Sequence, residues 1–249
     1  MRWGRLLGLS CAAGCSFQLP GEPPPGNATV DGATGADSAG DGTGSEGGPV
    51  ALGCIPGTWR QTALDTFDAE LGGWHLDTNA NGTTLAWAVG SSSLNGHSES
   101  SGTDCTKQTG ALGDSAVLAH LRVTSRANAT GFRVGGPIIR AQAVDAANNL
   151  FYACLVDEAA NMVYLARYDV ETQVGSGQGF THLAEAALGS PLPTSLTVTL
   201  CAQGTIISCD VVESGVHVSA NDFRYGTGEP GARVMLADVA LADFAVYQP

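Results

Sequence analysis

Short runs of β-branched and apolar residues, separated by turn residues, fill the sequence from residue 51 to its end. Ten such runs stand out: Thr84–Val89, Ala116–Thr124, Pro137–Gln142, Leu150–Val156, Met162–Tyr168, Ser195–Cys201, Ile206–Val212, Val216–Val218, Ala232–Ala237 and Ala242–Tyr247. Turn signals rich in Gly, Asn and Asp lie between them, which is typical of antiparallel strands. Only Ala159–Asn161 and His182–Leu188 have the composition of a helical turn. The pattern predicts one all-β domain over residues 51–249, built as a sandwich of two antiparallel sheets.

Several segments of this part, taken in their order along the chain, resemble a known family. The matching segments are Phe67-Asp68 with Gly72-Gly73-Trp74, Leu85–Val89, Ala119–Val123, Ile139–Gln142 with Asn148–Tyr152, Leu196–Val198 with Ile206–Val212, and Gly231–Val234 with Ala242–Val246. Their order over residues 64–248 resembles that of concanavalin A-like lectin/glucanase domains, of the laminin G-like kind found in bacterial surface proteins. The resemblance implies a two-sheet antiparallel jelly-roll sandwich.

The first fifteen residues have the layout of an export signal. Arg2 and Arg5 precede the short apolar run Leu6–Gly14, and small residues follow, as in such signals. The run Ala12-Ala13-Gly14-Cys15 resembles the lipobox of bacterial lipoproteins, which implies removal of signal peptide 1–14 and lipidation of Cys15. By the rule of that family, Ser16 directs the protein to the outer membrane of a Gram-negative cell. A plain secretory signal cleaved nearby is the alternative, and Cys11 is a second, poorer candidate for lipidation.

The segment that follows Cys15 is too polar to fold. Residues 16–50 hold nine Gly, five Pro, five acidic residues and no basic residue. Such a segment cannot bury enough apolar surface to offset its ordering entropy. We therefore expect residues 15–50 to form a disordered tether, with a root-mean-square span of about 30–35 Å for a flexible coil.

Charge excludes several classes of partner. The chain has 11 Lys and Arg against 24 Asp and Glu, a net charge of −13, and no basic cluster. Nucleic acids and anionic lipid surfaces are therefore excluded as partners.

Five of the seven cysteines lie in residues 51–249, and export permits disulfides. Cys201 and Cys209 flank the turn at residues 203–205, so the spacing predicts a disulfide between them, subject to the register of the hairpin. A bridge from Cys54 to Cys105, within the expected loop Gly90–Gly113, is a further pairing. Cys154 reads as a buried apolar residue.

No catalytic constellation stands out. The Glu-x-Asp-x-x-Glu run of jelly-roll glucanases is absent, and the only adjacent acidic pair, Asp157-Glu158, ends a strand at a turn. A retaining glycosidase needs two carboxyl groups about 5–5.5 Å apart. The sequence therefore predicts no catalytic residues.

Two groups of residues are candidates for binding. Asp68 and Asp243 lie near the ends of the first and last expected strands, where the resemblance implies a structural calcium ion; the alternative is that each is a turn or strand-end residue, because calcium takes more ligands than two. Aromatic side chains that stack on sugar rings are the second group, and the alternative for them is the hydrophobic core. The aromatic candidates for sugar binding are Trp87, Tyr152, Tyr164 and Tyr168.

These observations together predict a non-catalytic, surface-anchored binding module for a glycan or a cell-surface protein. A glycoside hydrolase on the same fold and a purely structural surface lipoprotein are the alternatives. Opposed carboxylates in a cleft favour the first alternative, and a featureless sheet face favours the second.

Overall fold

The structure, a computed structural model, describes residues 52–68, 72–76, 86–99, 102–125, 133–142, 150–169 and 179–249. All of these residues belong to one compact unit. The signal peptide 1–14, the lipidation site Cys15 and the tether 15–50 lie outside the described residues. Within the described ranges, no helix has the length and apolar character needed to cross a membrane.

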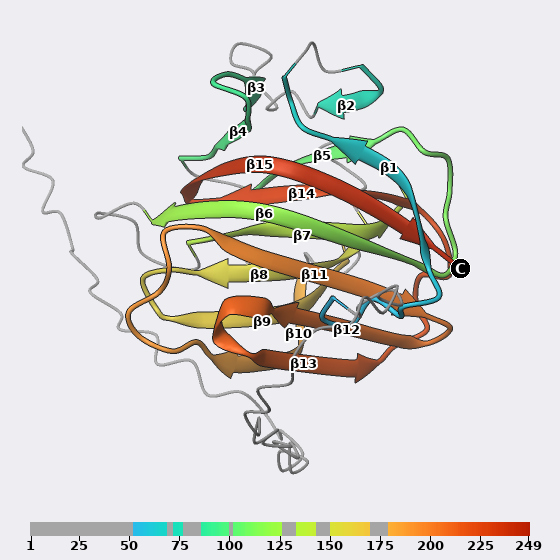
Figure 1. Cartoon of the computed structure of the whole chain (residues 1–249). Coiled ribbons are helices and arrows are strands. Elements are labelled where there is room, and N and C mark those ends of the chain that lie inside the picture. The colour runs from blue at the N-terminus through green and yellow to red at the C-terminus, as the bar shows by residue number, and fades with distance from the viewer. Residues whose placement is uncertain are drawn as a thin grey trace, which may run out of the picture. The chain divides into compact units, whose positions relative to one another are not determined.

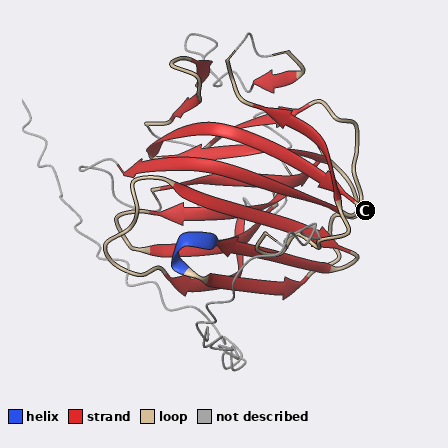
Figure 2. Ribbon diagram, in the orientation of Figure 1, coloured by secondary structure: helices blue, strands red, loops and turns tan. Residues whose placement is uncertain are grey.

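Two antiparallel sheets pack face to face as a jelly-roll sandwich (Figure 1). The eight-stranded sheet runs in the order β13 (Val216–Asn221), β12 (Ile206–Val211), β11 (Leu196–Gln203), β6 (Ser115–Ser125), β15 (Ala237–Gln248), β4 (Leu94–His97) and β3 (Trp87–Val89), with β1 (Arg60–Asp65) paired to β15. The seven-stranded sheet runs in the order β10 (Phe180–Ala187), β9 (Met162–Tyr168), β8 (Phe151–Asp157), β7 (Val134–Ala141), β14 (Glu229–Met235), β5 (Thr103–Lys107) and β2 (Trp74–Leu76). The helical content of the described part is the short 3₁₀ turn η2 (Val212–Ser214), drawn in blue in Figure 2.

The all-β class and the two-sheet sandwich predicted from the sequence are confirmed. The run Met162–Tyr168 agrees with β9 at both ends, and the other runs overlap strands of the two sheets. Thr84 and Leu85, at the start of the first predicted run, lie outside the described residues.

The expectation of a helical turn over His182–Leu188 is wrong. Most of this segment belongs to β10, which pairs with β9 from Phe180↔Tyr168 to Ala187↔Met162. Its Ala, Leu and Glu residues have high helix propensity, but hydrogen bonds to a neighbouring strand and side-chain burial override that preference.

The segment Gly90–Gly113, expected to be a loop, contains β4 and β5. The polar sequence of β5 does not look like a strand, because one of its two charged residues, Asp104, is buried against a partner in the sheet. Asp104 lies directly opposite Arg233 of β14, and the two side chains form a buried ion pair.

The centre of the seven-stranded sheet is buried on both of its faces. All seven residues of β8 are buried, and successive side chains of a strand point to opposite faces. One set of side chains fills the core between the sheets, including Trp87, Tyr152, Leu165 and Phe244. A second cluster lies on the outer face of this sheet and includes Val134, Ile138, Phe151, Leu155, Tyr164 and Met235.

The predicted disulfide between Cys201 and Cys209 is wrong, because of hairpin register. Cys201 pairs with Ser208, so Cys209 lies one position further along and its side chain points to the other face of the sheet. The cysteine at position 209 faces the core and bonds to Cys154 of β8, which joins the two sheets.

The other bridge joins Cys54 to Cys201 on the outer face of the eight-stranded sheet. Pairing of Cys54 with Cys105 is therefore also wrong, and Cys105 is a buried residue of the inter-sheet core. Cys154 is buried as expected, but it forms a disulfide instead of acting only as an apolar residue.

Candidate functional site

A groove of about 560 Å³ opens on the outer side of the seven-stranded sheet, where β2, β5, β7 and β14 come together. Cys105 faces the inter-sheet core, so its neighbour Thr106 points to the outer face by strand alternation. His75 lies opposite Thr106 in the ladder and shares that face. The lining consists of His75, Thr106, Gln108, Ala111, Ala141, Gln142, Thr227, Gly228 and Glu229.

The polar side chains of this groove retain unused hydrogen-bonding capacity. Thr106 donates its hydroxyl hydrogen bond to Oε2 of Glu229 at 2.8 Å, and Gln142 Nε2 donates to the Thr227 carbonyl at 3.4 Å. Among the described residues, the exposed side chains of His75 and Gln108 have no protein partner. A ligand in the groove therefore meets donors and acceptors that are not already satisfied by the protein.

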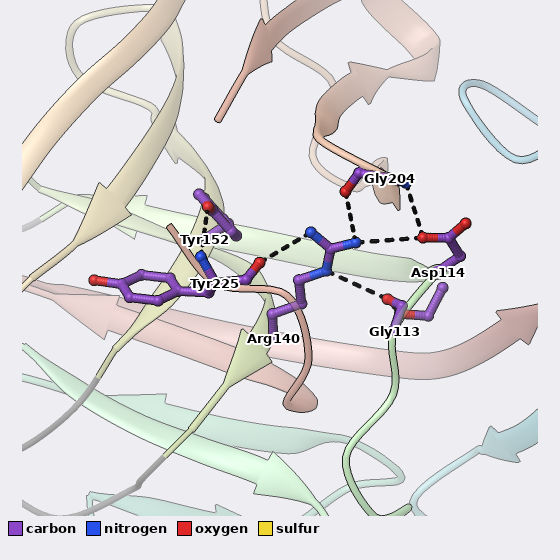
Figure 3. Close-up of polar contacts among 7 residues, drawn as sticks. Gly113, Asp114, Arg140, Tyr152, Gly204 and Tyr225 are labelled. Carbon is purple, nitrogen blue, oxygen red and sulfur yellow. Dashed lines mark hydrogen bonds and ion pairs between the residues drawn. The ribbon is translucent and has the colours of Figure 1, made fainter. Parts of the chain in front are cut away.

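The Arg140 clamp, made of the Arg140 guanidinium and the groups it contacts, holds the segments that line this groove. The buried guanidinium donates to the carbonyls of Tyr225 and Gly204 at 3.0 Å each and of Gly113 at 3.3 Å. Figure 3 draws these contacts as dashed lines. Asp114 Oδ1 lies 3.4 Å away and also accepts from the Gly204 amide. Because Gly113, Tyr225 and Gly204 belong to three different loops, one side chain fixes this end of the sandwich.

Arg140 has a φ of +56°, a conformation that non-glycine residues rarely adopt. This left-handed residue lies next to Ala141 and Gln142 of the groove, where the pairing of β7 with β14 shifts register. Such strain persists only where surrounding contacts determine the conformation, and here the clamp supplies those contacts.

At Gly228 the chain passes very close to the backbone of Arg140 and Ala141. A Cβ atom at this position would lie 2.3 Å from the Arg140 carbonyl carbon and 2.6 Å from the Ala141 oxygen. The Gly228 backbone also exchanges two hydrogen bonds with Leu112, at 2.8 and 3.0 Å. Only glycine therefore lets the strand that carries Glu229 enter the sheet at this point.

An aromatic and charged cluster occupies the same outer face further along β14. Arg233 forms a 2.6 Å ion pair with Asp104 and is only 3% exposed. Its guanidinium carbon lies 4.6 to 5.4 Å from the ring centres of Phe151, Tyr168 and Phe180, within the range of cation–π attraction. This part of the face is closed by its own packing.

Tyr164 and Tyr168, two of the proposed sugar platforms, belong to this packed region. Tyr168 stacks on Phe151 with centroids 5.1 Å apart and an interplanar angle of 6°. Tyr164 is 9% exposed and lines a cavity of about 10 Å³ with His182 and Met235, room for about one water molecule. Both tyrosines thus lie on the sheet face that carries the groove, but neither lines it, and a ligand-binding role for them stays a prediction.

Trp87 and Tyr152 are not open platforms. Both are fully buried in the core between the sheets. The Tyr152 hydroxyl donates to Asp222 at 2.6 Å and accepts from the Tyr225 amide at 3.1 Å. Burial, reinforced by the hydrogen bond to Asp222, raises the pKa of Tyr152. For these two residues the alternative interpretation, the hydrophobic core, is correct.

The two aspartates expected to hold calcium have different partners. Asp243 Oδ1 lies 2.6 Å from His120 Nδ1 on the neighbouring strand. Hydrogen bonds from Ser92 and Thr66 lower the pKa of the exposed Asp68. Across the described ranges, no three His, Cys, Asp or Glu side chains group as metal ligands would. Calcium takes six to eight oxygen ligands, so these two carboxylates would need further oxygen ligands, and a calcium ion at Asp68 and Asp243 stays a prediction.

The adjacent acidic residues Asp157 and Glu158 lie at the end of β8 and in the turn that follows it. Asp157 ends β8, is 4% exposed, and accepts a 2.9 Å hydrogen bond from the Ala160 amide in the following turn. Glu158 is exposed in that turn, away from the groove. The groove itself has one carboxylate among its described lining residues, Glu229.

None of the polar groove residues was predicted from the sequence. His75, Thr106, Gln142 and Glu229 come from four strands or strand ends that are far apart in the chain. The only local signal was the turn sequence at residues 226–231, where Gly228 precedes Glu229. Without the sheet order, nothing in the sequence groups these residues.

Comparison with known proteins supports the fold and not a closer relationship. No protein-family model matches the sequence, and no curated protein is similar to it in sequence. A carbohydrate-binding module, CBM66, from Bacillus subtilis superposes with a TM-score of 0.53 and 15% identity, covering 68% of this chain and 91% of the module.

Two further solved structures have similar scores. A protein of unknown function with a galectin-like fold from Bacillus subtilis has a TM-score of 0.53 and 11% identity, covering 76% of this chain and 96% of that one. The catalytic domain of an endo-1,3-β-glucanase (laminarinase) from Thermotoga petrophila has a TM-score of 0.52 and 9% identity, covering 76% and 98%. The described domain therefore has the concanavalin A-like jelly-roll fold that the sequence resemblance implied.

Proposed function

We propose that residues 51–249 form a non-catalytic glycan-binding module whose binding site is the groove between β2, β5, β7 and β14. The observation that carries this proposal is an open groove of about 560 Å³ whose polar side chains keep unused hydrogen-bonding capacity. Sugars expose many hydroxyl groups, so neutral amide and imidazole side chains match them. Gln108, His75 and Gln142 supply these groups from three different segments.

The fold alone does not separate binding from hydrolysis, since the domain superposes on both a carbohydrate-binding module and a laminarinase. The composition of the groove favours binding. A glycosidase of the usual kind needs two carboxyl groups flanking the scissile bond, and Glu229 is the one carboxylate among the described lining residues. Binding without cleavage is therefore the better account of this site.

We also propose that the module is held at the outer membrane by a lipid on Cys15, through a disordered tether of residues 15–50. The support for this proposal is the lipobox-like sequence and the composition of the segment. Two or more acyl chains give stable anchoring, where one chain gives only marginal binding.

A glycan array probed with the purified full chain, with and without calcium, tests the binding function. Every glycan retained is then titrated against the variants His75→Ala and Gln108→Ala. Each should weaken binding about fivefold through the loss of one hydrogen bond. Ser219→Ala, on the exposed part of β13 in the other sheet, is the matched control and should bind as the unmodified protein does.

Two outcomes would overturn the proposal: no retention of any glycan, or equal affinity in both groove variants and the control. Release of new reducing ends from a bound glycan would favour the hydrolase instead. For the anchor, Cys15→Ala should move the protein out of the membrane fraction, and its continued presence there would refute lipidation at this residue.

A further inference from the structure

The charge of the groove is set by one side chain. Glu229 is the one acidic residue among the described lining residues, and none of those residues is a lysine or an arginine. A ligand in the groove therefore meets a carboxylate with no lysine or arginine beside it in the described lining.

Glu229 is held in place with one oxygen left for a ligand. Thr106, which is fully buried, donates a 2.8 Å hydrogen bond to Oε2 of this carboxylate. The other carboxylate oxygen of Glu229, Oε1, has no protein partner among the described residues. The carboxylate is half-buried at the start of β14, where the close approach of Gly228 fixes the backbone. The group is thus oriented before a ligand arrives, which reduces the cost of binding.

Three basic side chains on the strands that form the groove are paired with other groups. Arg233, four residues along β14, is paired with Asp104 and covered by three aromatic rings. Arg140 donates to carbonyl groups and to Asp114 in the clamp. Lys107 forms a 2.9 Å ion pair with Asp65. None of these three cations is paired with Glu229.

We infer that the groove selects glycans that carry free amino groups and rejects glycans that carry carboxylates, with Glu229 as the specificity-determining residue. This inference rests on the proposed glycan-binding function and names the class of sugar. A protonated amine donates a charge-assisted hydrogen bond to Oε1, and such bonds are roughly twice as strong as neutral ones. Uronic acids meet repulsion from the same oxygen, and the net charge of −13 adds to it.

The size of the preference follows from that difference in bond strength. Relative to the N-acetylated sugar, the free amine should gain about tenfold in affinity. The groove is open to solvent, so salt screens the interaction and the preference should shrink at high ionic strength.

The test is calorimetric titration of the purified full chain in mildly acidic, low-salt buffer with three probes of equal length. These are an oligomer of β-1,4-linked glucosamine, its fully N-acetylated counterpart, and an oligogalacturonate. Glu229→Gln keeps an oxygen to accept from Thr106 and removes the charge. Glu158→Gln, in the exposed turn after β8, makes the same change in net charge away from the groove. His75→Gln removes the one other lining group that can become charged.

The expected result is an order of affinity of glucosamine, then N-acetylglucosamine, then galacturonate oligomers. Glu229→Gln should abolish the preference for the amine, while Glu158→Gln and His75→Gln should retain it. Equal or tighter binding of the N-acetylated oligomer by the unmodified protein would overturn the inference. Loss of the preference in Glu158→Gln to the same extent as in Glu229→Gln would also overturn it, because net charge would then be the cause. Failure of every glycan, charged or neutral, to bind would refute the proposed function itself.

Discussion

Replacing Arg140 with lysine tests whether one guanidinium holds the groove end of the sandwich. Arginine reaches acceptors in several directions from one planar group, whereas lysine is a single point charge. Two of the Arg140 hydrogen bonds, to Tyr225 and Gly204, are 3.0 Å long, and the contacts to Gly113 and Asp114 are 3.3 and 3.4 Å long. A lysine ammonium can keep one of the two short bonds, so one short bond and the longer contacts are lost. Both residues have a Cβ atom, so the φ of +56° affects them alike.

We expect Arg140→Lys to lower the free energy of unfolding by about 3 kcal/mol, since each hydrogen bond to a charged group contributes about 1.5–3 kcal/mol. For a domain of this size, that loss corresponds to a Tm lower by about 6–12 °C. The assay is urea unfolding followed by circular dichroism, with the slope against urea unchanged. Arg122→Lys, at an exposed position of β6, is the control and should shift stability by less than about 0.5 kcal/mol. A midpoint for Arg140→Lys equal to that of the control would refute the clamp.

Three further predictions concern the bridge between the sheets, a buried carboxylate and the groove glycine. Replacing Cys154 and Cys209 together with alanine reopens a loop of sequence separation 55 and should lower the free energy of unfolding by about 4 kcal/mol, measured as the urea midpoint; an unchanged midpoint would contradict the bridge. Burial alone would raise the pKa of Asp222, but hydrogen bonds from Tyr152 and the Arg224 amide and the charge of Arg167 lower it; Asp222→Asn should therefore cost about 3 kcal/mol at neutral pH. Because the folded pKa lies below the unfolded one, that difference should fade as pH drops below about 4, and a difference independent of pH would refute the assignment. Gly228→Ala places Cβ against backbone atoms of Arg140 and Ala141 and should weaken glycan binding at least tenfold, whereas Gly226→Ala, which meets nothing within 4 Å, should not.

The strands that could be predicted are those whose own residues carry the signal. Met162–Tyr168 is β-rich and begins after a turn, and it agrees with β9 at both ends. The strand β5 was missed because Asp104 looks like a loop residue until Arg233 of β14 is placed opposite it. The strand β10 was missed because the local propensity of its alanines is helical, while its pairing with β9 is not local.

Pairings across the fold could not be derived from spacing. The disulfide prediction failed by one position of register, since Cys201 faces Ser208 and not Cys209. Prediction of the site would also have required the order of the strands, because His75, Gln142 and Glu229 come together only once three strands are placed in the sheet. Among the aromatic candidates, alternation along a strand assigns residues to two faces without saying which face is the core; Tyr152 proved to be inside and Tyr168 outside.

The Cys54–Cys201 bridge fixes Cys54, near the start of the described domain, to strand β11. It lies on the outer side of the eight-stranded sheet, whereas the groove opens on the outer side of the other sheet. Cys54 and the proposed binding groove therefore lie on opposite outer faces of the described domain, so this disulfide does not cover the groove.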